Sequence, residues 1–223
     1  MNKKRLFSLI CVMFIIIVTS TYSFAWNDTV THRTLSKYAT NDSVLNKSSY
    51  LTDIGITNGL NENFFWNTNK SVIDWIQQGA QDEDAGSDFQ MARNIGRSFN
   101  HFHNPIQRWA NPGLDDWILL PPFHTTGESS ILWAQDSAGQ LNTPTKPGGD
   151  WSWDTIRRNY FYDALTAGND SDRQAYFAET FYGLGHQIHL IQDASQPDHV
   201  RNHAHPIDGS GHGGIETWVE EEC

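Results

Sequence analysis

Apolar residues recur at helical intervals in several parts of the chain. Residues 71–78 carry them at spacings typical of one helix face, and Gly79 follows as a residue that commonly ends a helix. Residues 154–165 and 170–191 have the same periodicity over greater lengths, and the second segment is rich in aromatic side chains. The pattern predicts one short and two longer amphipathic helices.

Breaker residues occupy the region between these helices. Residues 112–147 contain Pro121, Pro122 and a run rich in Pro and Gly from residue 143 onward, which predict loops around one short helix near residues 129–136. No segment of useful length alternates apolar and polar residues as a half-buried strand does. With no internal repeat, the simplest expectation is an all-α fold built as a single helical domain.

The first 25 residues have the pattern of a secretory signal peptide. Three basic residues precede an apolar run at 6–18, and Ser23 and Ala25 supply the small residues that cleavage requires. The run is shorter than the roughly 20 residues a membrane-spanning helix needs, and no later segment is more apolar. We expect residues 1–25 to be removed, leaving a secreted or periplasmic protein that begins at Trp26 and has no transmembrane segment.

The mature chain is strongly acidic. Three of the 15 basic residues lie in the leader, so 12 remain against 26 acidic ones, a net charge of −14. This balance argues against nonspecific attraction to nucleic acid, although bound divalent cations reverse the field locally.

The positions of the two cysteines indicate that the fold is stabilised by its hydrophobic core or by bound metals and not by a disulfide bond. Cys11 lies in the leader and Cys223 ends the chain, so no internal disulfide is expected. The sequence stops abruptly after three glutamates, which predicts that residues 26–223 are a C-terminally truncated domain.

Histidine and carboxylate residues recur at metal-ligand spacings. His189 and Asp193 are four residues apart on a predicted helix, so they share one face at the separation needed to hold a cation. His212 and Glu216 repeat this spacing, and His199 lies between the two pairs. This supply of ligands exceeds one site.

Other histidines have weaker patterns. His186 lies one turn before His189, where a supporting or packing role competes with metal binding. His203 and His205 have no partner at a useful spacing. For any single histidine the alternative is an ordinary surface or hydrogen-bonded core residue.

Further candidates stand upstream. An acidic run at 82–84 follows Gly79, although such a run alone usually marks a solvated loop, and His101 and His103 share a His-Phe-His motif. Cleavage of the leader would free the α-amine of Trp26, whose pKa of about 8 allows a metal to displace its proton near neutrality.

Taken in order, these residues resemble the bacterial zinc-dependent phospholipases C, which are related to the fungal zinc-dependent single-strand nucleases. Members begin their mature chain with Trp and bind three zinc ions in a helical domain. Their ligands are the amine and carbonyl of that Trp, a nearby His, an Asp five residues after a Gly, and a His before Phe. A His-x-x-x-Asp motif with a further His six residues on, and a final His-x-x-x-Glu, complete the set. Position by position, the pattern falls on Trp26, His32, Asp84, His101, His189, Asp193, His199, His212 and Glu216.

The resemblance also implies how the ligands divide among three zinc ions. The first ion would be bound by Asp84, His101, His189 and Asp193. The second would be bound by His199, His212 and Glu216. The third would be bound by Trp26 and His32, with Asp193 as a bridge.

Phosphodiester hydrolysis is the activity that the resemblance implies. Clustered zinc ions lower the pKa of a shared water from about 15.7 toward 7 and neutralise charge on the phosphodiester in the transition state. Asp84 is the candidate to orient or deprotonate that water. A role confined to metal binding is the alternative.

The expected substrate is a phospholipid, cleaved at the glycerol side of its phosphodiester during transient contact with a membrane surface. Glu216 favours the phospholipases, because the nucleases usually have Asp there, whereas Ala85 and Ser98 replace aromatic residues of the choline pocket in one branch. The alternatives are a single-strand nuclease or nucleotidase, with nucleic acid as the substrate, and a non-enzymatic extracellular protein that binds structural zinc.

Overall fold

The computed structural model describes residues 28–84, 97–108, 112–116, 125–142 and 149–201. The expected leader (1–25) and the last 22 residues (202–223) lie outside the described part of the chain. Three of the nine expected metal ligands, Trp26, His212 and Glu216, therefore lie outside it as well.

The N-terminal part consists of short helices that the apolar pattern did not predict. They are η1 (Asp28–His32), α2 (Arg33–Asp42), α3 (Val44–Lys47), α4 (Tyr50–Asp53) and η2 (Gly59–Asn61). Ser43 caps α3 by accepting a hydrogen bond from the backbone N–H of Leu45.

A small antiparallel hairpin follows, so the expectation of a purely helical fold was too strict. Strand β1 (Asn63–Phe65) pairs with β2 (Asn69–Ser71), with Phe64 opposite Lys70. Phe64 points into the core while its neighbours on the strand are exposed. Each strand has three residues, too few for its alternation to be distinguished from chance in the sequence.

Helix α5 (Val72–Asp82) begins where the sequence predicted but does not end at Gly79. Ser71 caps its first turn by accepting a hydrogen bond from the Asp74 N–H. The helix continues to Asp82, because Gly79 lies against a neighbouring helix: a Cβ there would be 1.9 Å from the Tyr182 carbonyl oxygen. The glycine serves close packing and does not terminate the helix.

The short helix expected in the loop region is present, together with elements that were not predicted. Strand β3 (Asp115–Asp116) pairs with β4 (Thr125–Thr126), and α7 (Ser130–Trp133) lies inside the expected range of 129–136. A second short helix, α8 (Ser137–Asn142), follows and was not predicted.

Both longer helices are present. Residues 153–166 are helical throughout, as α9 (Trp153–Thr155), the π-helical segment η3 (Ile156–Phe161) and α10 (Tyr162–Thr166). Helix α11 (Asp170–Asp193) is the longest of the described elements. Asn169 caps its N-terminus, because the Asn169 side chain accepts a hydrogen bond from the Asp172 N–H. Helix α12 (Pro197–Val200) follows with Pro at its first turn.

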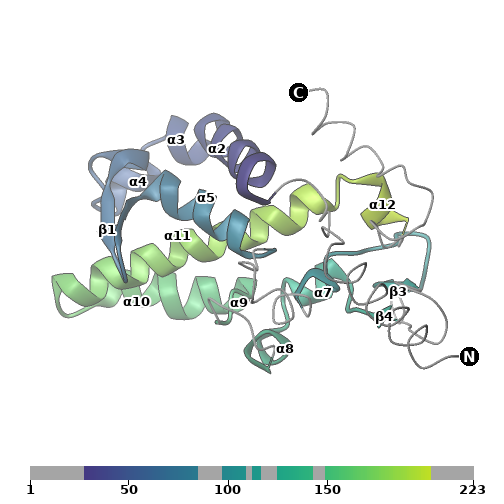
Figure 1. Ribbon diagram of the computed structural model, residues 1–223. Helices are drawn as coiled ribbons and strands as arrows, with labels where there is room; N and C mark the ends of the chain where they lie inside the picture. The colour runs from purple at the N-terminus through teal and green to yellow at the C-terminus, as the bar shows by residue number, and fades with distance from the viewer. Residues whose placement is uncertain (1–27, 85–96, 109–111, 117–124, 143–148, 202–223) are drawn as a thin grey trace, which may run out of the picture.

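Helix α11 runs across the molecule with α2 and α5 on one side and α9 and α10 on the other (Figure 1). Its most extensive packing is against α5. The buried aromatic side chains of Trp75, Trp151, Phe177 and Tyr182 gather around this pair, away from the C-terminal ends of the two helices. Burying side chains of this size is worth roughly 1.5–3 kcal/mol each, which fixes α5 against α11.

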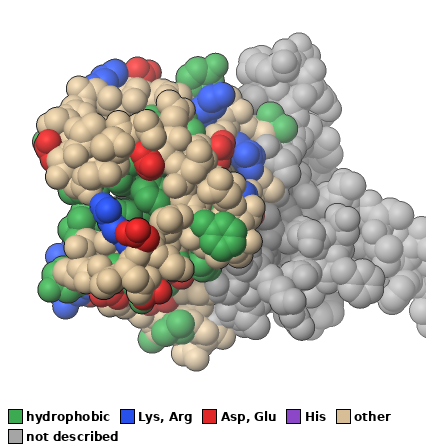
Figure 2. Space-filling model, turned by 90° about the vertical axis from the view of Figure 1, so that its left-hand side faces the viewer, with side chains coloured by type: hydrophobic (Ala, Val, Ile, Leu, Met, Phe, Trp, Pro, Cys, Tyr) green, Lys and Arg blue, Asp and Glu red, His purple; other side chains and the backbone are tan. Residues whose placement is uncertain are grey.

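The end of the molecule opposite those helix ends has an ordinary mixed surface. Figure 2 shows acidic, basic and hydrophobic side chains interspersed on that face, with no described histidine visible. Among the described helices, none combines the length and apolar character needed to cross a membrane.

Candidate metal centre

Four buried side chains from three separate segments meet beyond the C-terminal end of α5. Asp84 follows that helix, His101 lies in a turn, and His189 and Asp193 come from the last turns of α11. One ligand atom from each lies within 4.8 Å of all the others. These are the four residues that the resemblance assigned to one zinc ion.

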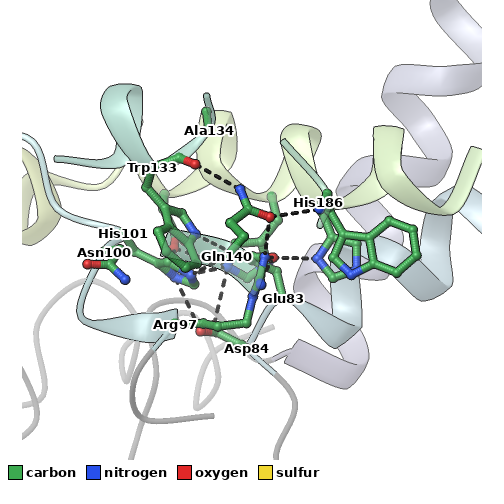
Figure 3. A network of polar contacts seen from close by, with 12 residues as sticks. Glu83, Asp84, Arg97, Asn100, His101, Trp133, Ala134, Gln140 and His186 are labelled. Atoms are coloured by element: carbon green, nitrogen blue, oxygen red, sulfur yellow. Dashed lines mark hydrogen bonds and ion pairs between the residues drawn. The ribbon is translucent and has the colours of Figure 1, made fainter. Parts of the chain in front are cut away.

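The distances place His101 between the two carboxylates. His101 Nδ1 is 2.8 Å from Asp193 Oδ2 and 3.3 Å from Asp84 Oδ1. Figure 3 shows His101 and Asp84 directed toward one another. Asp193 Oδ1 accepts no hydrogen bond from any described residue, although it is fully buried. A buried carboxylate oxygen in this condition is costly without a cation, so the donor set fits a bound metal.

His189 presents one defined nitrogen to the centre. Its Nδ1 lies 2.6 Å from the Ala80 carbonyl oxygen, which can only accept, so Nδ1 carries the proton. Its Nε2 lies 3.1 Å from Asp193 Oδ2 and 3.4 Å from Asp84 Oδ2. Fixing one ring nitrogen by a backbone acceptor leaves the other as a metal ligand, as is usual at metal sites.

His32 borders the centre, and, as in His189, an acceptor at Nδ1 fixes the orientation of its ring. Its Nδ1 is 2.6 Å from Gln192 Oε1, and the amide of Gln192 donates to Ser36 Oγ. Its Nε2 faces Asp193 Oδ1 at 3.5 Å, and the ring stacks on His189 with centroids 3.8 Å apart.

His199 approaches Asp193 from helix α12. Its Nδ1 lies 3.2 Å from the His101 carbonyl oxygen and 3.6 Å from Asp193 Oδ2. The ring stacks on Phe102, with centroids 4.3 Å apart and planes within 8°. The predicted residues His32 and His199 therefore both border the same carboxylate, Asp193.

In this cluster, neighbouring charges shift the pKa values of the buried groups in the direction opposite to the effect of burial. Burial disfavours the charged forms, but the Asp84 and Asp193 carboxylates and a contact with Glu83 raise the pKa of His101 to about 10. Burial would likewise raise the pKa of Asp193, yet His189 and His199 hold it well below its ordinary value. Without a metal, protons on the histidines balance the carboxylates, and a divalent cation would take over that role by displacing them.

The other sequence candidates that the structure describes have different partners. Asp82 accepts hydrogen bonds from Tyr182 and Gln78, and His103 Nδ1 contacts Ser129 Oγ at 2.8 Å. His186 does not join the ligands: its Nδ1 contacts Glu83, which agrees with the supporting role weighed for it. His203 and His205 lie outside the described residues.

The buried surroundings of Glu83 could not be predicted from the sequence. Glu83 was grouped with a solvated acidic run, yet it is completely buried with Arg97, Trp133 and Gln140 around it. Arg97 lies 14 residues after Glu83, and no local spacing in the sequence links the two.

No protein-family model matches the chain, and comparisons with curated proteins and with solved structures find no match either. The described residues define a mostly helical protein with a buried His/Asp cluster able to hold a metal ion.

Proposed function

We propose that the chain is a secreted, zinc-dependent phosphodiesterase with phospholipase C activity, which cleaves the glycerol-side phosphodiester bond of phospholipids. One observation carries the proposal. Four residues that the resemblance assigns to a single zinc ion, up to 109 positions apart in the chain, lie together and buried: Asp84, His101, His189 and Asp193.

The ligand types support zinc as the ion. The cluster offers two imidazole nitrogens and two carboxylates, a set that suits zinc in a four- or five-coordinate shell. Magnesium and calcium prefer sites built from oxygen ligands alone. The imidazoles therefore favour a transition metal, and zinc is the one that the resemblance implies.

Two further zinc ions belong to the proposal. The positions of His32 and His199 beside Asp193 are compatible with ions on either side of the first centre. We assign the third ion to His32 and Trp26, with Asp193 as the bridge. The second ion is assigned to His199 with the remaining pair, His212 and Glu216.

Zinc held here would supply an acidic water and positive charge to stabilise a phosphodiester in its transition state. Among the protein's own groups, Asp84 is suited to act on that water. Its Oδ1 lies 3.3 Å from His101 Nδ1 and its Oδ2 lies 3.4 Å from His189 Nε2, so both oxygens border the candidate ligand nitrogens. One oxygen can bind metal while the other orients the water or accepts its proton.

A side-by-side assay tests the function. Purified protein beginning at Trp26 is stripped of metal, reloaded with zinc, and incubated with mixed phospholipid micelles or with single-stranded DNA and RNA. We expect zinc-dependent release of diacylglycerol and phosphorylated headgroup from the micelles. Cleavage of nucleic acid alone would favour the nuclease. Bound zinc without either activity would contradict an enzymatic role and favour structural zinc.

A further inference from the structure

Glu83 is a buried carboxylate at the centre of a network of donors that lies beside the candidate metal centre (Figure 3). Arg97 donates to Glu83 Oε2 from both Nε, at 3.1 Å, and Nη2, at 2.6 Å. His186 Nδ1 donates to the same oxygen. Trp133 Nε1 donates to the other oxygen, Oε1, at 2.9 Å.

The network extends beyond the carboxylate and fixes its partners. Arg97 also donates to Gln140 Oε1, and its guanidinium lies over the Trp133 ring, 4.9 Å from the centroid. Gln140 in turn donates to the Trp133 carbonyl and accepts from the Trp151 N–H. Glu83 is thereby held in one orientation.

Glu83 Oε1 faces the ring of His101 from the side opposite the metal centre. His101 Nδ1 points at Asp84 and Asp193, whereas Nε2 lies 3.5 Å from Glu83 Oε1, long for a hydrogen bond. Nε2 has no closer acceptor among the described residues. When Nδ1 binds a metal it carries no proton, so the proton of the neutral ring resides on Nε2 and points toward Glu83.

Stability alone does not account for this arrangement. A buried ion pair is weak evidence of stabilisation, because removing both charges from water costs about as much as their attraction returns. The oxygen directed at His101 is also the one fixed by Trp133, so the network controls the atom nearest the metal ligand.

We infer that Glu83, held by Arg97, is a positioning residue that accepts a hydrogen bond from the Nε2–H group of metal-bound His101 and thereby directs Nδ1 to the metal. The inference rests on the proposed metal centre but not on the proposed substrate. The role of Glu83 is to set the tautomer and orientation of His101, as carboxylates that accept from metal-bound histidines generally do.

Metal affinity of the full chain tests this directly. Wild-type protein and the Glu83→Gln variant are stripped of metal and titrated with zinc against a chromophoric chelator, and with cobalt to record the visible ligand-field spectrum. We expect the variant to bind one ion about 10–100-fold more weakly and to show an altered cobalt spectrum. A residue with a purely structural role would change neither.

Asp150→Asn is the matched control for loss of a buried carboxylate. Asp150 is also buried and accepts from Thr155, Ser152 and Ser137, and it contacts none of the predicted ligands that the structure describes. The Asp150→Asn substitution should lower the melting temperature of the protein without changing its metal affinity. If Glu83→Gln does not fold, Glu83→Asp keeps the charge opposite Arg97 but withdraws the carboxylate, and a weaker loss of affinity is expected.

Wild-type affinity in a folded Glu83 variant would overturn the inference and leave the metal centre standing. Absence of metal binding by the wild-type chain would overturn the metal centre and the inference together. The two failures are therefore distinguishable.

Discussion

His189 and Asp193 face each other one turn apart on α11, with His189 Nε2 3.1 Å from Asp193 Oδ2. Helix α5 brings Asp84 to this pair because two glycines, Gly79 and Gly185, let the helices approach closely. A Cβ at Gly185 would be 2.2 Å from the Ile76 carbonyl oxygen. The candidate metal centre thus depends on the fit between two helices.

The substitution Gly79→Ala should disrupt that fit. The added methyl group would be 1.9 Å from the Tyr182 carbonyl oxygen, so the backbones must move apart. Overpacking of this kind costs about 1–3 kcal/mol, which urea denaturation measures as a lower midpoint. Gly168→Ala is the control, since nothing lies within 4 Å of a Cβ there. Equal midpoints for the two variants would contradict the role of Gly79 in packing.

Asp84→Asn should reduce turnover by several orders of magnitude while the fold and most of the zinc are retained. An amide oxygen still ligates weakly, but the amide cannot accept a proton from water. Steady-state kinetics on phospholipid micelles and metal analysis of the same preparation give the two quantities. Near-normal turnover would show that Asp84 does not act on water.

Asp82→Asn provides the comparison for that experiment. Asp82 lies two residues away but accepts hydrogen bonds from Tyr182 and Gln78, and makes none to the predicted ligands within the described residues. Losing part of such hydrogen bonding costs about 0.5–1.5 kcal/mol of stability. Its turnover should stay near that of the wild-type protein.

Much of the metal centre could be predicted from sequence because its strongest signals are local. His189 and Asp193 share a helix, and helical periodicity fixes which residues lie together on one face. Ser71 likewise marks a helix start through a side-chain cap that depends on neighbouring residues alone.

Long-range packing explains what the sequence did not reveal. Gly79 has the sequence context of a helix end, and only the position of Tyr182, 103 residues later, shows that it packs inside a helix. Glu83 and Asp84 are adjacent acids with different surroundings, because the chain leaving α5 directs Glu83 toward Arg97 and Asp84 toward His101 and His189 at the candidate metal centre. The spacing of residues along the sequence does not indicate which way either of these side chains points.

Stability should depend on pH through Glu179, which lies outside the metal centre on α11. Burial raises the pKa of its carboxyl from 4.5 to about 7. Between these values the folded protein binds a proton that the unfolded chain releases, so stability falls as pH rises through this window. Glu179→Gln removes this dependence and should be the more stable form above pH 7, as shown by melting temperatures from pH 5 to 8. If the melting temperatures of the wild-type protein and Glu179→Gln change with pH in parallel, Glu179 is not the group responsible for the pH dependence.

Removal of metal should lower stability. A ligand that binds only the folded state stabilises it by about 2.7 kcal/mol when its free concentration is 100 times its dissociation constant. Chelator-treated protein should therefore melt at a lower temperature, and zinc should restore the original value where magnesium does not. The same response in His189→Ala as in the wild-type protein would place the stabilising ion elsewhere.

Zinc stoichiometry is the most direct test of the metal centre. Metal-stripped protein beginning at Trp26 is reloaded with zinc, freed of excess, and analysed beside His101→Ala/His189→Ala and the control His103→Ala. We predict about three zinc ions per chain for the wild-type protein and the control, and at least one fewer for the double variant. Zinc-free wild-type protein, or a double variant that retains the full complement, would contradict the account.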